Sequence, residues 1–248
     1  MKENKSIAYA IVLGICMIAA AFFVGLGLTN FRSGVEHTIA ATGSASADFE
    51  SDLIVWRGYF SAYAWTAEEA YQSLNSDADA VKTFLKNSGV EEGDVVFSSV
   101  NIYKRSRDIY DDNGSYIGSE FDGYELSQTV TVTSDNLDAV EKVATDISSL
   151  LSAGIEFSSD APEYYYTQMD DIKLELIEKA TENSKQRVDI MAEQAGAKVG
   201  KLINSNLGVF QITAQNTGAS AYSYDGCLDT SSRMKTATIT VKLTYNLK

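Results

Sequence analysis

The chain of 248 residues contains only one proline, one histidine and two cysteines. With a single proline and 10% aromatic residues, it does not have the composition of a long disordered segment. Cys16 lies in an uncharged apolar run and Cys227 in a polar segment, so we expect no disulfide framework. Any catalytic site that uses histidine would have to use His37, which we interpret as a polar residue near a membrane.

The residue patterns that mark known catalytic and metal sites are also missing from the sequence. Neither the dinucleotide-binding GxGxxG pattern nor the phosphate-binding GxxxxGK pattern occurs. The acidic segment around Gly114 has Ile109 where an EF-hand calcium loop requires an acidic residue. Cys227 has no histidine near it in the sequence to activate it. We therefore expect no enzymatic activity, no catalytic residues, no metal site and no cofactor.

The charge of the chain is strongly acidic. It has 20 basic and 34 acidic residues, which give a net charge of −14. Such a surface repels phosphate backbones, so nucleic acid is not an expected partner. The one basic cluster, Lys104, Arg105 and Arg107, is followed at once by Asp108, and we interpret it as a solvated strand end.

Residues 6–28 form one uncharged apolar run. The run is long enough to cross the ~30 Å hydrocarbon core of a bilayer as a helix. Because Lys2 and Lys5 precede it, residues 1–5 are expected in the cytoplasm and the rest in the periplasm or outside the cell. Residues 29–36 would be a juxtamembrane linker, and residues 37–248 one exported domain.

We favour a retained single-pass anchor in the inner or plasma membrane over two alternatives. A cleaved signal peptide would have a shorter apolar core with a small-x-small cleavage site close behind it. A lipoprotein signal ending at Cys16 would have a small residue at the position of Ile15.

Hydrophobic periodicity predicts the elements of the exported domain. Alternating residues predict strands near residues 37–49, 53–64, 95–103, 126–133, 202–214 and 236–247. Helical spacing predicts helices over residues 66–88 and 136–151 and a long helix after Thr167, with Thr66 and Thr167 as caps. Residues 111–114 are predicted to be a hairpin tip, and residues 155–166 an extended segment broken by Pro162. The long helix has one apolar or small stripe, formed by Met169, Ile172, Leu176, Ala180, Ser184, Val188, Met191 and Ala195.

The order of these elements is weakly repeated within the chain. Strand, helix, strand and strand follow one another at residues 53–133 and again at residues 155–247, with the helix at residues 136–151 between them. The sequence therefore predicts an α+β fold, in which an N-terminal transmembrane helix precedes a domain of two β-α-β-β units with antiparallel sheets and one long helix.

Aromatic residues are the candidates for a binding surface. Trp56, Trp65, Tyr164, Tyr165 and Tyr166 could line such a surface. Aromatic residues in strands more often lie in a core or on a sheet face, and that interpretation remains open for all five.

Several short motifs together resemble the SIMPL-domain family. The resemblance covers roughly residues 35–248, nearly the whole exported part. It rests on residues 41–45 (ATGSA) leading to 51–56 (SDLIVW), on 164–166 (YYY) before the long helix, on 208–212 (GVFQI) after it, and on 228–232 (LDTSS) before the last strand.

This resemblance implies an envelope protein without established catalytic residues. Bacterial members of the family are periplasmic or envelope proteins, some are linked to oxidative stress, and some are similar to ring-forming oligomers. We therefore expect a non-enzymatic, membrane-anchored protein that acts through self-assembly as a homo-oligomer and through contact with an unidentified protein partner. Two alternatives remain open: an envelope hydrolase without a recognisable motif, and a small-ligand binding module built on the tyrosine-rich segment.

Overall fold

The computed structural model of the chain describes residues 14–26, 37–218 and 222–248. Residues 14–26 form a helix inside the predicted anchor, whose two ends lie outside the described residues. The predicted cytoplasmic residues 1–5 and the linker at residues 29–36 also lie outside them. Among the described residues, no helix has both the length and the apolar character that a membrane crossing requires.

The remainder of the chain has the expected α+β fold, and most of its strand pairs are antiparallel. It divides into two compact units. The larger unit comprises residues 44–180 and 208–240, and the smaller unit contains residues 37–43, 181–207 and 241–248. Three long elements contribute residues to both units: β1 (Thr38–Glu50), α4 (Met169–Gln194) and β11 (Met234–Leu247).

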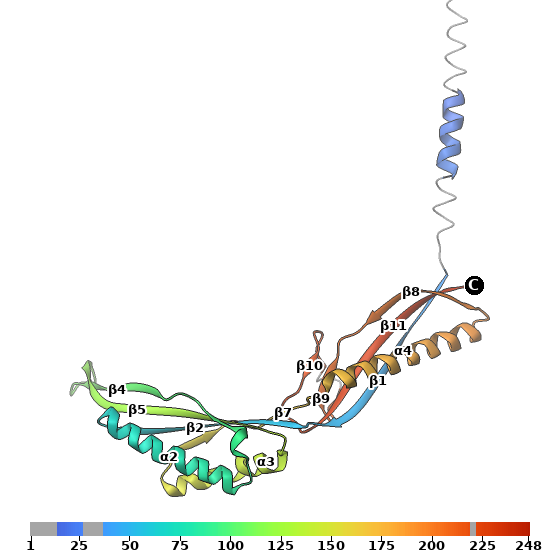
Figure 1. Cartoon of the computed structure of the whole chain (residues 1–248). Helices are drawn as coiled ribbons and strands as arrows, with labels where there is room; N and C mark the ends of the chain where they lie inside the picture. Colours follow the sequence, from blue (N-terminus) through green and yellow to red (C-terminus); the bar gives the residue numbers. More distant parts are fainter. Residues whose placement is uncertain (1–13, 27–36, 219–221) are drawn as a thin grey trace, which may run out of the picture. The chain divides into compact units, whose positions relative to one another are not determined.

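A six-stranded antiparallel sheet is the centre of the larger unit (Figure 1). Its two long strands, β2 and β5, pair from Ile54–Ser134 to Ala64–Tyr124 without a register shift. β2 has the predicted bounds, and its alternating residues Ile54, Trp56, Phe60 and Ala62 are buried. The strands are β2 (Leu53–Ala64), β3 (Val95–Phe97), β4 (Asn101–Tyr110), β5 (Tyr116–Ser134), β6 (Phe157–Ser159) and β7 (Glu163–Tyr165).

The predicted single strand over residues 95–103 is wrong, because the chain forms two strands there, β3 and β4. The break follows from Ser98, whose hydroxyl accepts a hydrogen bond from the Thr129 amide at 3.1 Å. This side chain takes the place of a backbone partner on the neighbouring strand, so the regular ladder stops and restarts at Asn101.

Helices cover one face of this sheet. α2 (Ala67–Asn87) begins as predicted after Thr66, whose hydroxyl accepts from the Glu69 amide, and it buries one stripe of residues from Ala70 to Leu85. α3 (Leu137–Asp146) is capped by Asn136, whose side chain accepts from the Ala139 amide. The predicted helix over residues 136–151 is therefore only partly α-helical, since its second half is the 3₁₀ helix η2 (Ile147–Ala153). A short 3₁₀ turn, η1 (Glu92–Asp94), precedes β3.

Three stacked aromatic rings form the centre of the larger core. The ring of Phe157 lies nearly parallel to those of Trp56 and Phe60, with centroids 5.9 and 6.1 Å away. Phe157 occupies the space above Gly58, which stands between the two other aromatic residues on β2. A glycine is needed there because any β-carbon would meet the Phe157 ring.

The second sheet has five strands, and its long central strand is β11. β11 pairs with β1 on one side, and on the other with β8 (Val199–Leu207) and β9 (Gln211–Ala214); β10 (Cys227–Leu228) pairs in parallel with β9. Every second residue of β1 from Ile39 to Phe49, and of β11 from Ala237 to Leu247, is buried or half-buried. The predicted strand over residues 202–214 is in fact two strands, β8 and β9, which contact different parts of β11.

The stripe of α4 differs from the predicted stripe at the C-terminal end of the helix. Its buried residues are spaced by four: Leu176, Ala180, Ser184, Val188 and Ala192. Met191 and Ala195 are exposed, because a stripe with a spacing of four rotates away from them along the helix. The helix begins at Met169, so Thr167 is not its cap, and its hydroxyl donates to Asp52 at 2.6 Å instead.

In the smaller unit, α4 packs closely on β1. Val188 and Ala192 form a small core with Ile39 and Ala41. The buried hydroxyl of Ser184 donates to the Ala41 carbonyl at 2.9 Å. Small side chains on both elements permit this short distance between helix and strand.

The strand pairs cross the boundary between the two proposed β-α-β-β units. β6 and β7, which belong to the second β-α-β-β unit in that hypothesis, both pair with β2 in the first sheet. The strand next to β11 is β1, which precedes both proposed units in the sequence.

Replacing Gly58 with alanine should destabilise the larger unit. The new β-carbon would lie 2.6 Å from Phe157 Cε1 and 2.9 Å from Trp56 Cη2, so the aromatic stack would have to shift. Overpacking of this kind costs about 1–3 kcal/mol, measurable as a lower midpoint of urea unfolding. The control is Gly93→Ala, because a β-carbon there meets no atom within 4 Å. An equal effect of both substitutions would contradict the assigned role of Gly58.

Candidate interaction surface

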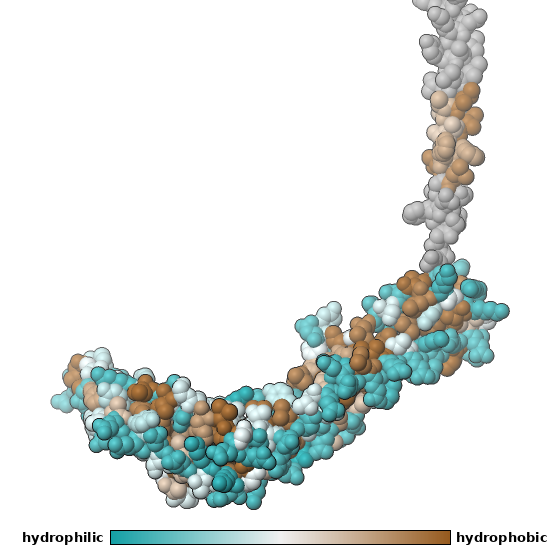
Figure 2. All heavy atoms as spheres, viewed as in Figure 1, coloured by the Kyte–Doolittle hydropathy of each residue, from teal (hydrophilic) through white to brown (hydrophobic). Residues whose placement is uncertain are grey.

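The hairpin of β4 and residues 116–123 of β5 forms an arm that is exposed on both faces (Figures 1 and 2). Tyr103 on one strand is 67% exposed and Ile117 on the other is 63% exposed. The predicted turn at its tip is present: Asp111 Oδ1 accepts hydrogen bonds from the amides of Asn113 and Ser115. The arm therefore presents large apolar side chains to solvent. The exposed ones are Ile102, Tyr103, Tyr110, Tyr116, Ile117 and Phe121.

A bulge and an aromatic cluster connect the arm to the sheet. Register is lost between the pairs Lys104–Tyr124 and Ser106–Phe121, at Gly123, whose φ of +86° suits glycine. Phe121 packs edge-on against Trp65 and against Tyr124, at centroid distances of 5.9 and 5.3 Å. These contacts fix the base of the arm, while the side chains beyond it remain uncovered.

Cations on the arm are paired within the arm. Arg107 forms an ion pair with Glu120, and Arg105 lies 3.5 Å from Glu125. Lys104 Nζ stands 5.2 Å from the centre of the Phe121 ring. The basic cluster is thus neutralised locally, which agrees with its interpretation as a solvated strand segment.

The face of the sheet opposite α2 is polar and partly exposed. Arg57 Nη1 donates to Glu163 at 3.0 Å, and this hydrogen bond raises the pKa of Arg57. The Tyr59 hydroxyl donates to Asp160 at 2.6 Å, which raises the pKa of Tyr59. Both pairs join β2 to the segment of β6 and β7, so they support the strand order as well as the surface.

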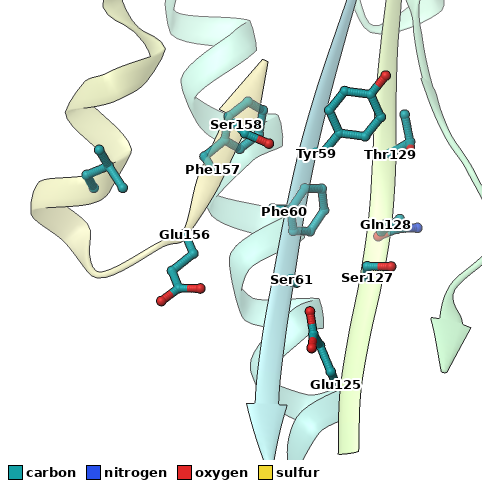
Figure 3. Close-up of a pocket in the computed structure, with 11 residues that line it drawn as sticks. Tyr59, Phe60, Ser61, Glu125, Ser127, Gln128, Thr129, Glu156, Phe157 and Ser158 are labelled. Carbon is teal, nitrogen blue, oxygen red and sulfur yellow. The ribbon is translucent and has the colours of Figure 1, made fainter. Parts of the chain in front are cut away.

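A hollow of about 430 Å³ lies between β2, β5 and β6 (Figure 3). Glu125 and Glu156 line it together with Tyr59, Gln128 and Phe157. It is open to solvent, and Gln128 uses its amide to donate to the Ser98 carbonyl at 2.7 Å. Two carboxylates line this hollow, but it is not a closed, apolar cavity of the kind that small-molecule sites use.

A loop before β11 connects several elements of the larger unit through charged groups. Arg233 donates to Glu50 at 2.7 Å, to Asp138 at 2.6 Å and to Glu141 at 3.3 Å. Tyr164 donates to the same Glu141 at 3.0 Å. Burial and this hydrogen bond both raise the pKa of Tyr164. These contacts link β1, α3 and β7, which is a structural role.

A family model described as SIMPL, a protein of unknown function (DUF541), matches residues 39–245. The chain belongs to the SIMPL family. The match extends from β1 to β11 and confirms the resemblance drawn from the short motifs. No curated protein matches the chain.

The SIMPL motif at residues 228–232 forms the loop just described. Asp229 Oδ1 accepts hydrogen bonds from the amide of Ser231 at 2.7 Å and from that of Ser232 at 3.1 Å. Burial alone would raise the pKa of Asp229, but the hydrogen bonds from Ser231 and Ser232 and the charge of Lys235 lower it overall. The backbone carbonyl of Thr230 accepts from the Tyr164 amide at 2.7 Å, so two SIMPL motifs, at residues 164–166 and 228–232, meet here.

The five aromatic candidates of the SIMPL domain do not form one surface. The prediction for Trp56 is wrong, because its side chain is 0% exposed in the core. Tyr164 packs against the same core, and Tyr166 packs on Phe49 at 5.0 Å. Trp65 is 60% exposed at the base of the arm, and Tyr165 is half-buried with its hydroxyl donating to Glu163.

Sequence reasoning located the tip of the arm but missed its length. The apolar residues of β4 and β5 beyond Gly123 do not alternate strictly, because both faces of the arm are exposed and neither requires one residue type. The paired spacing of Tyr110 and Tyr116 about the Asn-Gly turn was the available signal.

The other single residues noted in the sequence, His37 and Cys227, lie immediately before and at the beginning of a strand, respectively. His37 accepts, through its backbone carbonyl, a hydrogen bond from the Leu247 amide. Cys227 begins β10 and forms no disulfide with any residue that the structure describes. Within residues 14–26, 37–218 and 222–248, no three histidine, cysteine or acidic residues group as metal ligands would.

A buried lysine predicts how stability depends on pH. Lys235 is 1% exposed, and its ammonium donates to the Asp229 carbonyl; burial lowers the pKa of this lysine below its usual 10.5. Between the lowered pKa and 10.5, the unfolded chain binds more protons than the folded chain at this residue, so its contribution to stability rises with pH. We expect the unfolding free energy of the unsubstituted protein to rise over this window relative to that of Lys235→Met.

The measurement is urea unfolding of both proteins at a series of pH values from 7 to 10.5. Lys173→Met is the control, because Lys173 is solvent-accessible and bonds to exposed Asp170. A constant difference between the Lys235→Met and unsubstituted proteins across this range would contradict the prediction.

Proposed function

We propose that this SIMPL-domain chain is a non-enzymatic protein of the cell envelope, held in the inner or plasma membrane by residues 6–28. Its domain would lie in the periplasm or outside the cell and act through self-association and protein contact. The uncharged run after Lys2 and Lys5 supports the anchor and its orientation. The family match supports the domain assignment alone.

The exposed arm is the observation that carries the self-association proposal. A two-stranded hairpin gains little stability by itself in water, and exposed apolar strands are normally avoided because they pair or aggregate. The arm nevertheless has Tyr103, Ile117 and their apolar neighbours on its surface. A second copy of the chain that covers these side chains would account for their presence.

Charge opposes this association and makes it depend on salt. The larger unit has 11 basic and 29 acidic side chains, a net charge of −18. Two such units repel each other at low ionic strength, while apolar contact between arms is insensitive to it. Association through the arm should therefore strengthen as salt is added. The ring-shaped assemblies and the stress role implied by the family resemblance remain predictions for this chain.

The hydrolase alternative depends on the open hollow with Glu125 and Glu156. Turnover of an ester or amide substrate by the purified full chain, abolished by Glu125→Gln or Glu156→Gln, would replace the present proposal. The ligand-binding alternative requires a closed pocket at the tyrosine segment, but Tyr164 is packed against the core.

Substitutions on the arm should weaken self-association. The full chain carrying Ile102→Thr and Ile117→Thr loses two exposed aliphatic side chains but keeps good strand formers. Each apolar group buried in a contact contributes about 1 kcal/mol, so the dissociation constant should rise roughly tenfold or more. The measurement is light scattering of the detergent-solubilised chain over a series of concentrations.

Val96→Thr with Leu228→Thr is the matched control, because both residues are exposed on short strands outside the arm. It should associate like the unsubstituted protein. A strict monomer at high concentration and high salt, or equal weakening by the two double variants, would count against the proposal.

A further inference from the structure

Charge is divided unequally between the two units. Against the net −18 of the larger unit, residues 37–43, 181–207 and 241–248 of the smaller unit have six basic and three acidic side chains, a net charge of +3. The basic residues are Lys185, Arg187, Lys198, Lys201, Lys242 and Lys248, and the acidic residues are Glu182, Asp189 and Glu193. A basic surface attracts negatively charged partners, and in so acidic a chain it stands apart from the rest.

Half of these cations gather at one end of the smaller unit. The backbones of Lys198 and Lys248 exchange two hydrogen bonds, of 3.2 and 2.8 Å. Beside them, the Leu247 amide donates to the His37 carbonyl at 2.7 Å. The point at which the chain enters the domain, at His37, therefore lies next to Lys198 and Lys248.

A bulge adds a third cation to this end. Gly200 and Lys201 stand opposite the single residue Asn246, where the pairing of β8 and β11 shifts register. The extra residue is accommodated because Gly200 approaches Asn246 closely: a β-carbon there would lie 2.9 Å from the Asn246 carbonyl oxygen. Lys198, Lys201 and Lys248 are all exposed, and in the described part of the chain none of them forms an ion pair. We call these three residues the basic rim.

Chain length holds the basic rim close to the bilayer. Residues 29–36 separate the anchor at residues 6–28 from His37. The nine residue-to-residue steps from residue 28 to His37 span at most ~32 Å when extended, so His37 cannot be farther than this from the end of the anchor, and the basic rim lies beside His37.

We propose that the basic rim binds the anionic headgroups of the bilayer that holds the chain, an inference that rests on the anchoring proposed above. Each lysine near an anionic surface favours contact with it by roughly fivefold, and the attraction falls off within a Debye length. Exposed Leu202 and Ile203 follow Lys201 on β8 and offer apolar contact beside the charges. The rim thus orients the smaller unit at the membrane by a second, reversible attachment.

The test is lysine footprinting of the full chain in lipid nanodiscs. One set of discs contains phosphatidylcholine alone, and the other contains 30% phosphatidylglycerol. An amine-reactive reagent and mass spectrometry give the acylation rate of each lysine. We expect the rates at Lys198 and Lys201 to be roughly fivefold lower in the anionic discs at low salt, and equal in both lipids at 0.5 M salt. Lys86 and Lys142, exposed in the larger unit, should show no such dependence.

A pair of variants with the same charge change tests the rim directly. Lys198→Gln with Lys201→Gln should retain several-fold less phosphatidylglycerol than the unsubstituted chain when purified from mixed lipid and detergent micelles. Lys86→Gln with Lys142→Gln changes the net charge equally and should retain as much as the unsubstituted chain. An equal loss of phosphatidylglycerol in both variants would overturn the proposal, because the loss would then follow from the net charge of the chain and not from the position of the lysines.

The outcomes separate this inference from the proposed function. A chain recovered outside the discs refutes the anchor, and the rim proposal fails with it. A chain that inserts but shows equal rates at Lys198 and Lys201 in both lipids refutes the rim alone. Protection of the two lysines that depends on the number of chains per disc, and not on lipid charge, assigns the rim to contact with a second copy.

Discussion

The pairing of β2 with β5, filled by a layer of aromatic rings, is the interaction on which the larger unit depends. Eleven consecutive residues of β2 keep one register with β5, so every second side chain points into the core. Phe157 then reaches over Gly58 and connects Trp56 with Phe60. Because β6 supplies that ring, the segment after α3 is held on the edge of β2, and the neighbouring β7 follows it.

The smaller unit is held together differently. Its core contains few large side chains, and the contact between α4 and β1 depends on Ala41, Val188 and Ala192. Such a core excludes less apolar area from water, so hydrogen bonds contribute more to fixing its geometry. Ser184 and Arg187 supply them, by donating to the carbonyls of Ala41 and Thr42 at 2.9 and 3.1 Å.

Much of this fold could be predicted from the sequence, for reasons that differ between elements. β2 and α2 were predicted with nearly correct bounds because one face of each is buried and the other is not. The type of α4 and the middle of its stripe, from Leu176 to Val188, also followed, but its C-terminal end did not, because the spacing of four buries Ala192 in place of Met191. The strands with which β6, β7 and β1 pair could not be predicted. Strand pairing depends on long-range contacts such as that of Phe157 with Gly58.

The surface was harder to predict than the core, for a related reason. A core residue is constrained by its neighbours, whereas an exposed aromatic and a buried one look alike in sequence: Trp56 and Trp65 differ only in the structure. Charged residues, by contrast, can be counted before the structure is known. How they are divided between the two units can be stated only once the fold is known. Residues 181–207 and 241–248 are far apart in sequence, and only the pairing of β8 with β11 places their lysines in one unit.

This partition constrains how the domain would behave near an anionic bilayer. The field of such a surface extends only about 8–10 Å at physiological ionic strength, so it acts on whichever side chains come that close. It would attract the net +3 of the smaller unit and repel the net −18 of the larger one. Both effects favour the same orientation, in which the arm of β4 and β5, part of the acidic unit, stays in solvent. The surface on which the proposed self-association depends would then be kept from the lipid by the charge of its own unit.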